Sequence, residues 1–107
     1  MIAFGKDSAA RRVSAAVSRR VLAHSGGMML VEFRFEKGGV GEPHRHAGHE
    51  QIGYILEGVF EVRCGEETQV LGAGDCYYAG INELHGVVAL EEGRILDAFT
   101  PVRQDFL

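Results

Sequence analysis

Residues 38–58 read GGVGEPHRHAGHEQIGYILEG and contain three of the five histidines in the chain. Pro43 follows a glycine-rich break and introduces an extended segment, so we expect a strand that begins at His44. His44 and His46 stand two positions apart, and alternate side chains of a strand point to one face. Two neutral imidazoles on one face can bind the same ion, so this stretch predicts the start of a metal site.

The chain from residue 17 onward alternates apolar and polar residues in short segments that glycine-containing breaks separate. We expect strands over residues 17–24, 28–35, 51–56, 59–64, 68–71, 76–79, 85–90 and 94–99, with the first two joined as a hairpin. Strands at intervals of about 8 to 12 residues are typical of an all-β sandwich or barrel. A closed or double-sheet form leaves few exposed strand edges, so we favour that form.

The length and composition suit one turn-rich domain, because the 107 residues include 15 glycines and only 2 prolines. The N-terminal part is Ala-rich and lies outside the strand pattern. We therefore predict an arm or a short helix over residues 1–20 and a single domain over residues 21–107. Four arginines of the N-terminal part are interpreted as a solvated basic cluster rather than a targeting peptide: Arg11, Arg12, Arg19 and Arg20.

The charge and hydropathy patterns exclude two classes of partner. A net charge of -4 argues against a nucleic-acid-binding protein, which needs a basic face to displace counterions from phosphate. No segment approaches the roughly 20 apolar residues of a membrane span, so we expect no membrane association. Cys64 and Cys76 lack CxxC spacing, and we interpret them as two buried thiols of a cytoplasmic protein.

The opening stretch resembles the first motif of the cupin family, G-x5-H-x-H-x4-E-x6-G. Gly38, His44, His46 and Gly58 match it, and Gln51 occupies the position where most cupins have a glutamate ligand. Glu50 is the alternative, although the six-residue step to Gly58 then fails. Which of the two side chains faces the interior of the barrel distinguishes them.

The second cupin motif, G-x5-P-x-G-x2-H-x3-N, follows at the spacing of small single-domain cupins. Gly74 and His85 match it, while Gly80 replaces the proline, Asn82 replaces the glycine and Ala89 replaces the asparagine. The two motifs imply a small single-domain cupin, that is, a double-stranded β-helix or jelly-roll barrel. They also imply one divalent transition-metal ion, Zn, Ni, Fe or Mn. Its ligands would be His44, His46, Gln51 and His85.

A closer resemblance is to the KdgF proteins, which process the 4,5-unsaturated monouronates released by pectate and alginate lyases. It rests on the histidines with Gln51, on HGVVALE at residues 85–91, on LDAFTPVR at residues 96–103 and on DFL at residues 105–107. It implies an isomerase-like, metal-dependent enzyme that opens the uronate ring and yields a linear 4-deoxy-5-keto uronate. By the same resemblance Asp97 and Arg103 are the catalytic residues and the ligand is a carboxylated sugar. By analogy with small cupins, we expect a homodimer that forms through strand exchange or sheet packing at exposed edges.

The residues themselves leave alternatives open at both of these positions. Alternation points Asp97 inward with Ile95 and Phe99, where burial would raise its pKa, or outward toward an arginine. The planar fork of Arg103 suits a substrate carboxylate, and an unengaged surface arginine is the other interpretation. Two further functions compete with uronate conversion: a cupin dioxygenase that needs oxygen, and a non-catalytic cupin that binds or senses a sugar acid.

Overall fold

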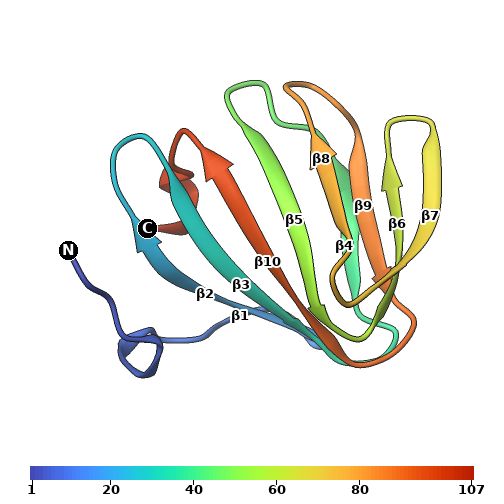
Figure 1. Cartoon of the computed structure of the whole chain (residues 1–107), viewed down its shortest axis with the longest axis horizontal. Coiled ribbons are helices and arrows are strands. Elements are labelled where there is room, and N and C mark those ends of the chain that lie inside the picture. The colour runs from blue at the N-terminus through green and yellow to red at the C-terminus, as the bar shows by residue number, and fades with distance from the viewer.

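Ten strands form two antiparallel sheets in the computed structural model, which describes residues 1–107 (Figure 1). The strands are Arg11–Ser14 (β1), Val17–His24 (β2), Met29–Phe35 (β3), Val40–His44 (β4), Glu50–Glu57 (β5), Val59–Cys64 (β6), Glu67–Gly72 (β7), Cys76–Ala79 (β8), His85–Ala89 (β9) and Gly93–Thr100 (β10). One sheet has the order β1-β2-β3-β10-β5-β8, and the other has the order β4-β9-β6-β7. The all-β prediction is confirmed, and each of the eight predicted strands matches an observed one within a residue at either end.

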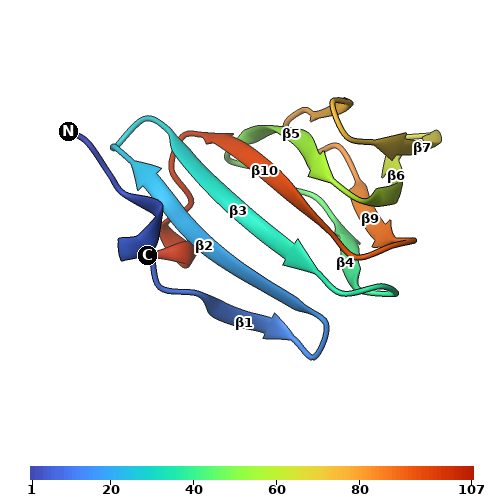
Figure 2. The same ribbon diagram turned by 60° about the horizontal axis from the view of Figure 1, so that its bottom comes forward.

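The core forms between the two sheets because alternate residues of their strands point inward. In β10, Ile95 and Phe99 are 1% exposed, and every second residue of this strand is buried. Phe60 of β6 packs edge-on against Phe35 of β3, with ring centroids 5.1 Å apart, and so joins the two sheets. A smaller apolar cluster around Val31 and Phe99 extends toward the C-terminal segment. Figure 2 shows β2, β3 and β10 side by side in the larger sheet.

Gly58 is the point where the chain leaves one sheet for the other. Its φ angle is +91°, which side chains disfavour, and an added Cβ would lie 2.6 Å from the carbonyl oxygen of Glu92. The tight connection at residues 57–58 therefore links β5 in the larger sheet to β6 in the smaller one. This change of sheet places the residues of β5 and those of β6 on opposite walls of the interior.

The prediction of an arm or a short helix over residues 1–20 is wrong for its second half. Residues 11–14 and 17–20 lie in β1 and β2, which pair as a hairpin, and β2 continues the larger sheet against β3. Pairing with β3 and burial of Val17, which is 3% exposed, outweigh the helix preference of alanine. Before β1 the chain is largely exposed and contains only the short 3-10 helix Gly5–Asp7 (η1); a second one, Gln104–Phe106 (η2), ends the chain.

The two cysteines are free, but the prediction that both are buried is wrong. Cys76 is exposed because it precedes Tyr77 on β8, and Tyr77 takes the inward position. Cys64 is half-buried, and its Sγ lies 2.9 Å from the carbonyl oxygen of Tyr78. No helix in the structure has the length and apolar character needed to cross a membrane.

Candidate metal centre and its buried carboxylate

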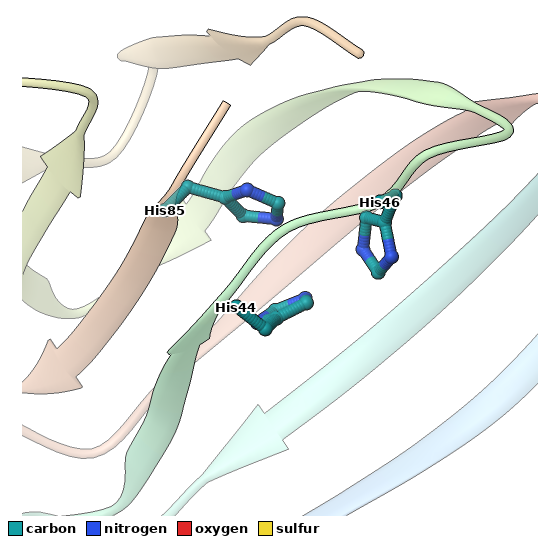
Figure 3. Close-up of side chains that lie close together, drawn as sticks. All are labelled: His44, His46 and His85. Atoms are coloured by element: carbon teal, nitrogen blue, oxygen red, sulfur yellow. The ribbon is translucent and has the colours of Figure 1, made fainter. Parts of the chain in front are cut away.

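Three histidines, one exposed, one half-buried and one buried, point toward one another, and their ligand atoms all lie within 4.8 Å of one another (Figure 3). His44 is the last residue of β4, and His85 is the first residue of β9, directly opposite it in the ladder. The expectation of a strand that begins at His44 and carries His46 is wrong, because β4 ends at His44 and His46 lies in the loop that follows. The convergence of the imidazoles therefore depends on this loop.

Asn82 holds that loop in place from the second motif. Its backbone N–H donates a hydrogen bond to the carbonyl oxygen of His46 at 2.6 Å. The φ angle of Asn82 is +63°, the left-handed conformation for which the motif has a glycine, and asparagine adopts it more readily than most residues. The replacement of glycine by Asn82 thus keeps the backbone geometry of the turn that fixes His46.

Gln51, not Glu50, points into the interior. Gln51 is 5% exposed, and its Oε1 lies 3.0 Å from Nε2 of His85. Glu50 is exposed and accepts a hydrogen bond from the hydroxyl of Tyr78 at 2.9 Å. Successive residues of β5 point to opposite faces, so only one of the two can reach the histidines.

The arrangement of donors and acceptors around His85 fits a metal cation. Nδ1 of His85 lies 2.9 Å from the carbonyl oxygen of Glu83, so this nitrogen carries the proton and donates it. Nε2 of His85 is then unprotonated and can only accept. The amide nitrogen of Gln51 donates to Asp97, so the Gln51 atom that faces Nε2 is Oε1, which also only accepts. Two facing lone pairs repel each other unless they share a cation, and imidazole and amide oxygen both ligate divalent metals.

The other two histidines are also suited to bind metal as neutral imidazoles. His44 directs Nδ1 at the carbonyl oxygen of Glu42, 2.7 Å away, which leaves its Nε2 for an ion. Burial, with the charge of Arg103 as the second cause, lowers the pKa of His46 to about 3. Burial also lowers the pKa of His85, against the opposing effect of its bond to Glu83. Protons therefore compete weakly with a metal ion at His46 and His85.

Asp97 is a buried carboxylate beside the histidines, so the structure shows the inward one of the two orientations that alternation left open. It is 6% exposed, and its Oδ1 accepts hydrogen bonds from Gln51 Nε2 at 3.3 Å and from the hydroxyl of Tyr77 at 3.1 Å. Burial raises the pKa of Asp97 to about 7, although the two hydrogen bonds and the charge of Arg103 act in the opposite direction. A carboxyl group with such a pKa can both donate and accept a proton near neutral pH.

Arg103 reaches the same site, but Asp105 occupies its planar fork. Nε and Nη2 of Arg103 donate to the two carboxylate oxygens of Asp105 at 3.2 and 2.6 Å. Its remaining terminal nitrogen, Nη1, lies 3.4 Å from Nε2 of His46. Arg103 thus presents one nitrogen to the site in this structure, rather than the free fork that the sequence interpretation assumed.

Tyr77 and Arg19 belong to the site although the sequence pattern gave them no role in it. Both line a cavity of about 620 Å³ together with His44, Gln51, His85, Asp97 and Arg103. Gly53 makes room for Tyr77, because an added Cβ at residue 53 would collide with the tyrosine ring. The inward position of Tyr77 in the alternation of β8 was a usable signal. Arg19 lies in the strand expected over residues 17–24, but it was interpreted as part of a solvated basic cluster.

Comparison with known proteins identifies the family. A model described as a cupin domain matches residues 31–99. The chain is also 47% identical over 92 residues to the pectin degradation protein KdgF of Dickeya dadantii (strain 3937), which covers 85% of this chain and 84% of that protein. The chain is a cupin of the KdgF family.

Solved structures support the assignment of this chain to the KdgF-like cupins. KdgF from Halomonas sp. superposes with a TM-score of 0.95 at 36% identity, over 100% of this chain and 98% of that one. An RmlC-like cupin from Shewanella frigidimarina NCIMB 400 superposes with a TM-score of 0.93 at 33% identity, over 97% and 93% of the two chains. The match to the Halomonas protein spans the N-terminal residues, so the hairpin formed by β1 and β2 lies within the region of similarity.

Proposed function

We propose that this KdgF-like cupin converts 4,5-unsaturated monouronates into linear 4-deoxy-5-keto uronates, as a metal-dependent, isomerase-like enzyme. One observation carries the proposal: Asp97, a buried carboxyl group with a pKa of about 7, lines the same cavity as His44 and His85, two of the three convergent histidines. The 47% identity to a pectin degradation protein supports a substrate from this class of sugar acids.

The metal ligands we propose are His44, His46, Gln51 and His85. All four are neutral, so a divalent ion would keep its full charge, which favours an anionic ligand. A bound ion would supply Lewis acidity toward the oxygens of a carboxylated sugar. Imidazole and amide oxygen ligate Zn, Ni, Fe and Mn, and we propose one divalent ion of this group.

Asp97 is the residue we assign to proton transfer. Ring opening breaks the bond between C1 and the ring oxygen. The C1 hydroxyl loses its proton and becomes an aldehyde, and the ring oxygen, which stays on C5, gains a proton and becomes the hydroxyl of an enol. Ketonisation then adds a proton at C4 and removes the proton from the enol oxygen, which leaves the composition unchanged. A carboxyl group that titrates near pH 7 can take the second proton and deliver the first. Hydrogen bonds from Tyr77 and Gln51 hold its Oδ1, leaving Oδ2 as the transferring atom.

Arg103 is the residue we assign to holding the substrate beside Asp97. Its fork bonds to Asp105 fix the guanidinium, and its Nη1 points to the side of the site where His46 lies. A guanidinium held in this way donates from a fixed position, which reduces the conformational entropy lost when the substrate binds.

The test is the loss of the near-ultraviolet absorbance of the double bond when the purified protein is mixed with lyase-generated unsaturated monouronate. We expect decay faster than the spontaneous rate, its loss on chelation and its recovery when a divalent metal is added. Activity in the absence of oxygen separates this function from a dioxygenase. Decay at the spontaneous rate would reject the proposal.

Asp97→Asn tests the assigned role of the carboxyl group. Loss of a general acid and base typically lowers turnover by about 10²- to 10⁴-fold, and metal binding should survive because no proposed ligand changes. Asp7→Asn removes one carboxylate in the exposed η1 and serves as the matched control. Normal turnover in Asp97→Asn would remove Asp97 from the mechanism.

We also propose that the protein is a homodimer that packs through the outer face of its larger sheet. Strand register aligns Leu30, Ala98, Ile52 and Tyr78 in one row across four strands, and Tyr54 stands in the next row. Ile52 and Tyr78 are 50% and 55% exposed, and an apolar row of this kind suits a second copy. Light scattering should give a dimer for the wild type and a monomer for Ile52→Glu. Val70→Glu, on exposed β7 of the other sheet, is the control.

The location we propose is the cytoplasm. Cys64 and Cys76 are both free, as is usual where thiols are kept reduced. Fractionation of cells that express the protein, followed by detection with an antibody, tests the location.

A further inference from the structure

Arg19 points into the barrel from a position where strands usually carry apolar residues. On β2 it stands between Val17 and Val21, which pack into the two apolar clusters, and its partner across the ladder is Phe33. It lines the same cavity as His85 and Asp97. An arginine in an apolar row lowers the stability of a barrel unless a partner compensates its burial.

No carboxylate in the chain forms an ion pair with Arg19. Arg20, Arg34, Arg94 and Arg103 each form an ion pair, whereas Arg19 forms none, and its Nε is buried without a hydrogen-bond partner. Burial lowers the pKa of Arg19. The nearby negative charge of Asp105 raises it, but by less than burial lowers it. Unpaired buried donors are uncommon in folded proteins, and one at a cavity wall is suited to a ligand.

Phe106 fixes the guanidinium of Arg19 relative to Arg103. The central carbon of the Arg19 guanidinium lies 4.0 Å from the centroid of the Phe106 ring, and that of Arg103 lies 4.1 Å from the same centroid. The two cations share one aromatic support, but only Arg103 has Asp105 in its fork. Arg19 is therefore the guanidinium in this cavity that has no anion of its own.

We propose that Arg19 binds the carboxylate of the sugar-acid substrate and makes this cavity prefer acidic sugars over their neutral counterparts. This inference rests on the proposed function, because it assumes that a carboxylated sugar enters the cavity. It extends that function by naming Arg19 of β2 as the residue that binds the substrate carboxylate, while Arg103 and Asp97 contact the sugar ring.

The test compares the affinity of the Zn²⁺-loaded protein for D-galacturonate, a saturated uronate, with its affinity for the uncharged methyl ester of that sugar, by calorimetry. In Arg19→Met the affinity for D-galacturonate should fall by roughly 10- to 100-fold, the range of a charge-assisted hydrogen bond, and the affinity for the ester should stay unchanged. Arg19→Lys, which keeps the charge without the fork, should lose less.

Arg20→Met is the matched control, because Arg20 follows on the same strand and pairs with Glu32 at 3.6 Å on the other face. It should bind both sugars as the wild type does. Thermal melting in the absence of ligand separates binding from folding, since Arg19→Met removes an unpaired buried donor and should not lower the melting temperature.

Three results would overturn the proposal. They are an equal affinity of the wild type for acid and ester, an unchanged preference for the acid in Arg19→Met, and an equal loss of both affinities with a lower melting temperature. Selective loss of D-galacturonate affinity in Arg19→Met would support it. That result, combined with no turnover of unsaturated uronate by the wild type, would keep the carboxylate site and reject the proposed reaction.

Discussion

The ionised form of Asp97 should destabilise the metal-free protein, and replacement by asparagine should reveal how much. Burial raises the pKa of this carboxyl group from 3.8 to about 7. The native state therefore holds the proton more tightly than the unfolded state. Stability from this source is complete below pH 3.8, falls as the pH rises, and is fully lost above about pH 7.

The magnitude follows from the same two pKa values. At about 1.4 kcal/mol for each pKa unit, the free energy of unfolding should fall by about 4 kcal/mol between pH 4 and pH 8 through Asp97 alone. Asparagine keeps the Oδ1 acceptor for Tyr77 and Gln51 but does not titrate. Asp97→Asn should therefore match the wild type near pH 4 and exceed its stability by about 4 kcal/mol at pH 8.

Urea unfolding of chelator-treated protein between pH 4 and pH 8 measures this difference at each pH. Asp7→Asn, in the exposed η1, controls for the loss of one negative charge. A difference between Asp97→Asn and the wild type that does not change with pH would refute the reasoning. A variant that is less stable at pH 8 would show that the carboxylate has a compensating cation in solution.

Further predictions concern the surroundings of the site. Tyr77→Phe removes one of the hydrogen bonds that lower the pKa of Asp97, so the pH at which stability is lost should move upward in the same urea experiment; a downward move contradicts this. Gly53→Ala should cost about 1–3 kcal/mol by urea unfolding and lower turnover, because its methyl group would displace Tyr77; normal turnover would show that Tyr77 need not stay in place. Phe60→Ala should cost about 3–5 kcal/mol by the same assay, and a cost below 1 kcal/mol would mean that the sheets repack. Asn82→Ala should lower stability by about 1–2 kcal/mol, because residue 82 has a positive φ angle that alanine disfavours, whereas Asn82→Gly should not lower it. Equal melting temperatures of the alanine and glycine variants would contradict this.

Strand positions were predictable because alternation is a local property. The period of two along residues 94–99 placed Ile95, Asp97 and Phe99 on one face, and the structure buries all three. The glycines at turns marked the ends of the strands, so the boundaries of eight of the ten strands differ from the predicted ones by no more than a residue, β1 and β4 being the exceptions. Of the N-terminal hairpin only the first strand, β1, was missed, because its strand character comes from pairing with β2 and not from its own sequence.

The members of the site were partly predictable for the same reason. The spacing of His44, His46 and His85 matched a known pattern of motifs, and the structure brings their ligand atoms together. Their placement was only partly correct, because His46 lies beyond the end of β4 and is positioned by a hydrogen bond from Asn82, 36 residues later in the chain. A contact of this kind has no local signature.

The sequence by itself determined the all-β class, the positions of most strands and the residue types that converge in the barrel, since short-range periodicity and motif spacing encode these directly. Only the tertiary structure decided that Gln51 rather than Glu50 faces the histidines, and that Tyr77 bonds to Asp97. It also decided that Asp105 occupies the fork of Arg103 while Arg19 lacks an anion. These pairings depend on distances and burial between segments far apart in the chain, which no local pattern of residues specifies.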